Sequence, residues 1–256
     1  MPGVVRVVIP ARYASTRLPG KPLRLIAGRT MLEHVYARAR DAAVGDVVIA
    51  TDDPRIVAAA HGFGADVQLT SADHLSGTDR LAEVARVRGW ADEDIVVNVQ
   101  GDEPLLPPAN VVQVAALLAA DPGAALATLA TPLAEPGDYR DPNVVKVVVA
   151  GTRALYFSRS PLPWHREFAS AGPDSLDPWQ GALRHVGLYA YRVGDLKRLA
   201  ALPPTPLERA ERLEQLRALE SGLAIAIAVA HAAPGPGVDT EDDLARVDAA
   251  LSRPMI

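Results

Sequence analysis

The sequence predicts an α/β protein with a mostly parallel central sheet, and three observations carry this prediction. Short apolar runs of strand length, such as residues 4–9 and 95–99, recur along the first half of the chain. Ala-rich amphipathic segments of helix length separate these runs, and this alternation is typical of parallel βαβ units. After about residue 124 the apolar runs follow one another without such segments, which indicates a second part with antiparallel strands.

In the first half, each expected strand leads into an expected helix. Thr30 is a candidate N-cap, because its hydroxyl can accept a hydrogen bond from the first turn of a helix. The expected strands are residues 4–9, 47–50, 66–69 and 95–99, and the expected helices are residues 30–42, 54–61, 78–88 and 108–120.

The second half is expected to form a β-rich insertion and then to return to helices. Strands are expected at residues 124–131, 144–149 and 155–158 with no helix between them, and again at 184–191 and 223–230. One charged helix is expected at 206–220, ended by Gly222, and a closing helix at 240–251, with Thr240 as N-cap and Asp243 at the capping-box spacing. A long loop rich in proline and aromatic residues is expected at 160–179. We therefore expect one domain, residues 1–256, with an embedded mixed β subdomain at roughly residues 124–205.

The composition excludes several classes of protein. Of the 256 residues, 49% are hydrophobic and 22% are charged, which is enough to bury a core and argues against global disorder. The net charge of −5 argues against a general binder of nucleic acid or membrane surfaces. The absence of cysteine excludes disulfides, thiolate metal sites and a cysteine nucleophile. No signal sequence and no apolar run approaching the roughly 18 residues of a membrane span are found, so we expect a cytoplasmic protein without membrane insertion.

The loop after the first expected strand carries the strongest functional signal. Arg12, Arg17 and Lys21 lie within ten residues, beside three prolines and a glycine that stiffen the turn. A rigid cationic loop at the carboxyl end of a strand is where an α/β sheet binds a polyphosphate, and a solvated basic turn is the alternative. The loop is not a Walker A motif, because Ser15 stands where Gly is needed and Pro22 follows the lysine. The chain also lacks the Gly-x-Gly-x-x-Gly pattern, which disfavours a nicotinamide oxidoreductase.

Two aspartates are candidate metal ligands. Asp102 lies in the turn that follows the strand at 95–99, beside the place where the first loop would hold a nucleotide. Mg²⁺ is commonly held by one or two carboxylates together with substrate phosphates, and Asp239, at the start of the closing helix, is a candidate second carboxylate. The alternatives are an ordinary turn residue for Asp102 and a helix-start charge for Asp239.

Two further segments suit an acidic sugar. Arg159 and Arg166 are suited to a carboxylate, since a guanidinium holds a carboxylate in a fork. His185 and Tyr189 are four residues apart on an expected strand and therefore share one of its faces, although a lone histidine there is also compatible with a structural role. The polar loop at residues 72–80 is a candidate contact for a base or a ribose.

Many long segments of the chain resemble the 3-deoxy-D-manno-octulosonate (Kdo) cytidylyltransferase family, whose members are also called CMP-Kdo synthetases. These segments run nearly from end to end and are PARYASTRLPGKPL, ATDD, SADHLSGTDRLAEV, VNVQGDEP, NVVKVV, ALYFSRSPLPW, LRHVGLYAYR, LERAERLEQLR and PGVDTEDDLARV. The resemblance implies a Rossmann-like nucleotide-diphospho-sugar transferase fold with a β-rich subdomain for sugar binding and dimerisation. It also implies a homodimer that requires Mg²⁺ and converts CTP and Kdo to CMP-Kdo and pyrophosphate for lipopolysaccharide synthesis. The anomeric hydroxyl would attack the α-phosphate in line.

The resemblance assigns a role to each matching residue. The nucleotide would be held by Pro10, Ala11, Arg12, Ser15, Arg17, Lys21, Asp73, Ser76, Gly77 and Arg80, and the sugar by Gln100, Arg159, Arg166, His185, Tyr189, Glu214 and Gln215. Asp102 and Asp239 would bind Mg²⁺, and these two aspartates form the expected catalytic set together with Arg17 and Lys21. The chain departs from the family pattern at His165, where relatives often have Asp, and over residues 167–180, so the resemblance says less about that loop.

Two other functions stay open from the sequence. A CMP-transferase for a related acidic sugar, such as an 8-amino Kdo analogue or a sialic acid, would need only a small change, because one loop residue can read an amine in place of a hydroxyl. The CMP-sialic acid synthetases resemble the first loop but differ from the later segments. A non-catalytic nucleotide-binding protein on the same fold is the other alternative, and metal-dependent release of pyrophosphate would exclude it.

Overall fold

Every strand that the sequence predicts is present, with ends that differ from the expected ones by no more than two residues. The computed structural model describes residues 3–14, 17–74, 76–164, 166 and 180–252, and within them nine strands join one sheet. These strands are β1 (Val5–Ala11), β4 (Asp46–Thr51), β5 (Asp66–Leu69), β6 (Ile95–Asn98), β7 (Leu126–Pro132), β8 (Lys146–Ala150), β9 (Arg153–Ser158), β10 (Leu183–Arg192) and β11 (Ile225–Val229).

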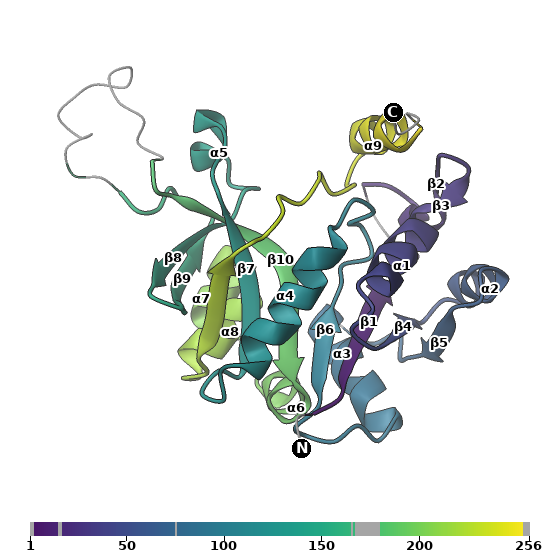
Figure 1. The fold of residues 1–256 in the computed structure, drawn as a ribbon, viewed down its shortest axis with the longest axis horizontal. Helices are drawn as coiled ribbons and strands as arrows, with labels where there is room; N and C mark the ends of the chain where they lie inside the picture. The colour runs from purple at the N-terminus through teal and green to yellow at the C-terminus, as the bar shows by residue number, and fades with distance from the viewer. Residues whose placement is uncertain (1–2, 15–16, 75, 165, 167–179, 253–256) are drawn as a thin grey trace.

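The sheet has a parallel end and a mixed end. Its strand order is β5-β4-β1-β6-β10-β7-β11-β9-β8 (Figure 1). The first four of these strands are parallel neighbours, whereas β10 runs antiparallel between β6 and β7. β8 and β9 form an antiparallel pair at the far edge, and β8 also pairs with the start of β10. This arrangement confirms the expected α/β fold. Four parallel strands form one end of a sheet that is mixed as a whole, and β7 and β11 form a further parallel pair within the mixed end.

Helices cover both faces of the sheet. One buried cluster joins Val7 of β1 to α1 (Met31–Asp41), α2 (Pro54–Gly62) and α4 (Pro108–Ala119). A second cluster joins the neighbouring residue, Val8, to α3 (Gly77–Val87), α6 (Val193–Ala201) and α8 (Gln215–Glu220). Successive strand residues therefore face opposite helix layers, as the two-residue period of a strand requires. Because both faces are covered, the inner parallel strands β1, β4 and β6 are mostly apolar and buried, whereas the edge strand β5 is partly exposed.

The expected helix starts are confirmed. The hydroxyl of Thr30 accepts a hydrogen bond from the backbone N–H of Glu33 at 3.2 Å. The closing helix, α9 (Glu241–Leu251), begins with a capping box in which Thr240 and Asp243 exchange side chain–backbone hydrogen bonds. None of the described helices is long and apolar enough to cross a membrane.

Two expectations for the second half are wrong. A short helix, α5 (Pro136–Arg140), lies between β7 and β8, and its five residues are too few to show a helical period in the sequence. The single helix expected at 206–220 is two helices, α7 (Pro206–Glu211) and α8. Arg212 interrupts them with a left-handed backbone, φ 53°, a conformation for which glycine is the usual sequence signal. α6 has no counterpart among the expected elements.

The end of the chain packs against its beginning. α9 lies beside the two-stranded hairpin of β2 (Leu25–Ile26) and β3 (Arg29–Thr30) (Figure 1). A separate buried cluster joins these segments, and its members are Leu18, Ile26, Met31, Val238, Leu244 and Val247. The cationic loop after β1, which includes the short 3-10 helix Lys21–Leu23, is therefore covered by the closing segment.

Candidate active site

A cavity of about 440 Å³ opens at the carboxyl ends of β1 and β6. Its lining residues are Pro10, Ala11, Arg12, Ala14, Arg17, Lys21, Pro22, Met31, Gly77, Gln100, Gly101, Asp102 and Asp239. Most of the predicted nucleotide ligands, one predicted sugar ligand and both predicted metal ligands are in this set. Ligands of α/β sheets bind outside the carboxyl ends of the strands, so this cavity is the candidate active site.

A close approach of two loops shapes one wall of the cavity. A Cβ atom built on Gly101 would lie 2.9 Å from the backbone oxygen of Pro10, a separation at which something must shift. Glycine therefore allows the turn after β6 to sit directly against the end of β1. This contact places Gln100 and Asp102 beside the cationic loop.

Lys21 contacts both predicted metal ligands. Its Nζ lies 2.7 Å from Asp102 Oδ2 and 2.8 Å from Asp239 Oδ1, and Arg17 lies 3.1 Å from the same Asp239 oxygen. Because both carboxylate oxygens contact one atom, they are at most 5.5 Å apart, the sum of the two distances. The two aspartates thus converge on one cationic group, and their role as metal ligands stays a prediction.

The segment before α9 brings Asp239 to this position. Val238 is buried, and its backbone N–H donates to the backbone oxygen of Asp102 at 2.9 Å. At the start of α9, Glu241 forms a two-bond ion pair with Arg24, at 2.6 and 2.8 Å. These contacts tie the closing segment to the turn after β6 and to the cationic loop, and so hold the Asp239 carboxylate near Lys21.

Burial and charge shift two pKa values at this place. Burial lowers the pKa of the Lys21 ammonium, but the attraction of Asp102 and Asp239 outweighs it, and the pKa is raised above its usual value. Burial, with repulsion from Asp102 and Asp239, raises the pKa of Glu103 to about 7, against the opposing charges of Arg184 and Lys21. Glu103 is missing from the sequence-based prediction, although its position directly after Asp102 is a signal for it.

Several predicted nucleotide ligands do not line the cavity. Arg80 is completely buried and pairs with Asp52 at 3.1 Å. The hydroxyl of Ser76 caps α3, and Asp73 makes hydrogen bonds within its own loop. Ser15 lies outside the described residues. A role of these four residues in nucleotide binding stays a prediction.

His185 and Tyr189 lie on one face of β10, with ring centroids 5.3 Å apart. Residues four apart on a regular strand are separated by about 13 Å. The register of β10 against β7 shifts between Val186 and Tyr189, and such a bulge shortens the strand locally. Burial raises the pKa of the Tyr189 hydroxyl well above its usual value, so this group is neutral and able to donate.

Glu214 connects this pair to the cavity. It accepts a hydrogen bond from the hydroxyl of Thr78 at 2.7 Å, and the residue before Thr78 in the chain, Gly77, lines the cavity. Burial raises the pKa of the Glu214 carboxyl, and the charge of Glu214 contributes to the raised pKa of Tyr189. Gln215, the first residue of α8, is buried beside it.

Arg159 is tied to the break between α7 and α8. Its Nε donates to the backbone oxygen of Glu211 at 2.7 Å, and its Nη1 donates to the backbone oxygen of Pro142 at 2.7 Å. Glu211 is three residues before Glu214, so the interrupted helix carries both the anchor of Arg159 and a second predicted sugar ligand. No contact among the described residues joins Arg166 to this group.

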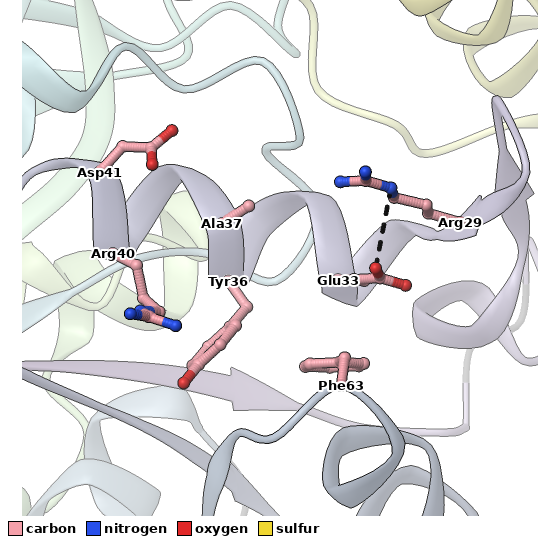
Figure 2. A pocket seen from close by; sticks show the side chains of 7 residues that line it. All are labelled: Arg29, Glu33, Tyr36, Ala37, Arg40, Asp41 and Phe63. Carbon is pink, nitrogen blue, oxygen red and sulfur yellow. Dashed lines mark ion pairs between the residues drawn. The ribbon is translucent and has the colours of Figure 1, made fainter.

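A second cavity, of about 400 Å³, lies beside α1 (Figure 2). It is lined by Arg29, Glu33, Tyr36, Ala37, Arg40, Asp41 and Phe63. The rings of Tyr36 and Phe63 are 5.5 Å apart, and Arg29 pairs with Glu33 at 3.8 Å. None of the predicted site residues is in this lining, and its charges are of both signs. We therefore place the candidate site at the ends of β1 and β6.

The carboxylates of Asp102 and Asp239 fit a magnesium ion whose other ligands include oxygens of the substrate. Among the described residues, no group of three or more His, Asp or Glu side chains is arranged to hold a metal. Mg²⁺ commonly takes only one or two carboxylates from the protein and the rest of its ligands from water and phosphates. Opposite oxygens around Mg²⁺ are about 4 Å apart, so the oxygens of Asp102 and Asp239, at most 5.5 Å apart, need only a small shift to share one ion.

Comparisons with known proteins show the family to which the chain is similar. Residues 6–225 match the model of the protein family described as Cytidylyltransferase, a stretch that ends before Asp239. The 3-deoxy-manno-octulosonate cytidylyltransferase of Xanthomonas axonopodis pv. citri is 56% identical over 242 residues, which are 94% of this chain and 93% of the relative. The enzyme of the same name from Thioalkalivibrio sulfidiphilus is 55% identical over 96% of this chain and 98% of the relative.

Solved structures show the same similarity. The structure of CMP:2-keto-3-deoxy-manno-octonic acid synthetase complexed with CTP has a TM-score of 0.87 and 43% identity, and covers 97% of this chain and 98% of that one. A cytidylyltransferase from Leptospira borgpetersenii has a TM-score of 0.63 at 18% identity, and covers 98% of this chain and 87% of that one. The second likeness concerns the fold alone.

Proposed function

This chain belongs to the cytidylyltransferase family, and we propose that it transfers CMP from CTP to the anomeric hydroxyl of Kdo and releases pyrophosphate. The observation that carries the proposal is the convergence of Arg17, Lys21, Asp102 and Asp239 at one cavity. The printed names of the relatives, and of a solved structure complexed with CTP, support the choice of both substrates.

The cationic loop would bind the triphosphate. In the transfer, the bond between the sugar oxygen and the α-phosphorus forms, and the bond from the α-phosphorus to the oxygen that bridges the α- and β-phosphates breaks. Pyrophosphate leaves with that oxygen, and the proton of the sugar hydroxyl passes to solvent water. Both substrates are anions, and two unit charges about 4 Å apart repel by about 4 kcal/mol at an effective dielectric of 20. Arg12, Arg17 and Lys21 line the cavity, where they would offset that repulsion and stabilise the charge that grows on pyrophosphate.

Asp102 and Asp239 would hold Mg²⁺ against the phosphates. A bound Mg²⁺ supplies neutralisation of phosphate charge and polarisation of the attacking hydroxyl. Lys21 contacts both carboxylates, so it would hold the two oxygens close to each other. With phosphates present, its ammonium would turn to them, because they bring several negative charges to the same place.

The sugar would lie on the side of Gln100, His185, Tyr189 and Glu214. Gln100 is in the cavity lining. Glu214 accepts a hydrogen bond from Thr78, which directly follows the lining residue Gly77. Arg159 suits the sugar carboxylate, because two backbone oxygens hold two of its nitrogens and so fix the direction of the guanidinium. We also expect a cytoplasmic homodimer that serves lipopolysaccharide synthesis; all three of these points stay predictions.

Pyrophosphate release from CTP and Kdo, with Mg²⁺ and with a chelator, tests the proposal. Asp102→Asn weakens one metal ligand with almost no change of volume, so turnover should be almost lost while the circular dichroism spectrum is unchanged. Asp242→Asn is the matched control, because Asp242 is exposed and has no ion pair among the described residues. Normal turnover of Asp102→Asn at limiting Mg²⁺ would show that the assignment is wrong. A panel of acidic sugars with CTP separates Kdo from its analogues.

A further inference from the structure

The hydroxyl of Thr128 lies at the centre of the bulge in β10. Thr128 is a residue of β7 and is completely buried. Its Oγ1 lies 3.0 Å from the backbone oxygen of Val186 and 2.9 Å from that of Leu188. The same oxygen lies 3.0 Å from Nε2 of His185. The bulge lies between Val186 and Tyr189, which are both still in register with β7, and the one Thr128 hydroxyl meets the carbonyl groups of Val186 and Leu188.

These three contacts favour one arrangement of the protons. A hydroxyl has one proton to donate and lone pairs with which to accept. Both carbonyl oxygens can only accept. If the Thr128 proton pointed at Nε2, the hydroxyl oxygen would face both carbonyl oxygens with no proton between them. Donation to one carbonyl leaves a single such contact and lets a protonated Nε2 donate to the Thr128 oxygen, so the form with the proton on Nε2 is favoured.

The His185 ring is neutral, so it has only this one proton. Burial, with the neighbouring charge of Arg184, lowers the pKa of His185 to about 3. With Nε2 protonated, Nδ1 holds a free lone pair, and none of the described residues forms a hydrogen bond with it. Phe157 packs edge-on at 4.9 Å and Tyr189 lies 5.3 Å away, so the ring is held in place from two sides.

We propose that Thr128 is a positioning residue that holds His185 in the form protonated on Nε2, so that Nδ1 accepts a hydrogen bond from a hydroxyl group of the sugar substrate. This inference rests on the proposed function, because it takes the sugar to bind at His185. Thr128 itself does not touch the sugar. A sugar that lacks the hydroxyl in question would lose this bond.

The protonation state can be observed directly in the wild-type protein. With ¹⁵N-labelled histidine, the two-bond couplings to the ring protons identify each nitrogen, and His185→Asn identifies the signals of residue 185. We expect a pyrrole-type shift for Nε2 and a pyridine-type shift for Nδ1 at neutral pH. A wild-type ring protonated on Nδ1, or on both nitrogens, would overturn the proposal without any variant of Thr128.

Two substitutions test the part played by the hydroxyl. In Thr128→Val, Nε2–H is left without an acceptor in a buried place, which is unfavourable, so the form protonated on Nδ1 should appear. The KM for the sugar should rise about two- to tenfold, the loss expected for one hydrogen bond, while the KM for CTP stays the same. Thr128→Ser keeps the hydroxyl and should restore both the spectrum and the KM.

The outcomes separate this inference from the proposed function. An unchanged His185 spectrum in Thr128→Val would overturn the inference, even if the enzyme makes CMP-Kdo. An unchanged sugar KM in His185→Asn would overturn the inference because the sugar does not meet the ring. An absence of pyrophosphate release by the wild type with CTP, Kdo and Mg²⁺ would instead contradict the proposed function. A merely structural role of Thr128 would lower stability without moving the proton on His185.

Discussion

Replacing Lys21 with methionine tests whether this lysine holds together two carboxylates that form a metal site. Its Nζ lies 2.7 Å from Asp102 and 2.8 Å from Asp239. Methionine keeps an unbranched side chain but removes the charge, which leaves the Asp102 carboxylate without its partner and Asp239 with Arg17 alone. We expect nucleotide-free Lys21→Met to bind Mg²⁺ more tightly than the wild type, because the metal no longer displaces an ammonium group. Turnover should fall at the same time.

The magnitude follows from the distances. Two unit charges 5.5 Å apart, the largest separation that the two contacts allow, repel by about 3 kcal/mol at an effective dielectric of 20. The side chains of Asp102 and Asp239 are 38% and 48% exposed, so water screening reduces the repulsion to about 1 kcal/mol. Relief of that repulsion by Mg²⁺ corresponds to a Kd about fivefold lower. Loss of one positioned donor typically costs a factor of about 10²–10³ in kcat.

Calorimetric titration of Mg²⁺ into the nucleotide-free protein measures the first effect, and pyrophosphate release measures the second. Lys21→Arg is the matched control, because it keeps the positive charge and should bind Mg²⁺ as the wild type does. Equal or weaker Mg²⁺ binding by Lys21→Met would refute the view that the aspartates form a metal site held closed by lysine. An unchanged kcat would refute the catalytic role of Lys21.

Three other predictions follow from single residues of the site. Gly101→Ala puts a Cβ 2.9 Å from the Pro10 oxygen, so urea denaturation should show a free energy of unfolding lower by about 1–3 kcal/mol. An unchanged free energy of unfolding would show that the turn after β6 can move away from the end of β1 without cost. Arg159→Ala should raise the KM for Kdo and leave the KM for CTP unchanged, and equal changes in both would assign Arg159 to the nucleotide or to the fold. The pKa of Glu103 is raised to about 7 in the folded state from 4.5, so the folded state binds the proton more tightly and stability falls as the pH rises through this interval. The Tm of Glu103→Gln relative to the wild type should therefore be higher at about pH 8 than at about pH 5, and a constant difference would contradict the raised pKa.

The parts of the site that the sequence predicts are those that follow from parallel strands. The runs that become β1 and β6 are apolar except for Arg6 and Asn98, so they are readily identified as buried strands of a parallel sheet. The residues that follow them must then meet at one edge of the sheet, which brings the cationic loop to Asp102. The capping box of Thr240 and Asp243 places the start of the closing helix equally well.

The features of the fold and of the site that the sequence does not predict depend on packing between distant segments or on irregular backbone. Arg212 divides a charged helix although nothing in its residue type favours a left-handed backbone. The bulge in β10 depends on the partner strand, because Thr128 supplies the hydroxyl that meets its carbonyl groups. The raised pKa of Glu103 comes from burial among other charges, and Arg80 is completely buried in the folded protein. None of these properties is determined by a short stretch of neighbouring residues.

The contact between Lys21 and Asp239 joins residues 218 positions apart, and this has a consequence for biosynthesis. While the chain is being translated, the cationic loop and the turn bearing Asp102 emerge early, but the second carboxylate emerges only near the end. A nascent polypeptide can therefore complete most of its sheet before the proposed second metal ligand is present, and we expect it to be unable to turn over nucleotide at that stage. If Asp239 has the proposed role, translational arrest or a proteolytic cut between β11 and Asp239 would yield a largely folded but inert product.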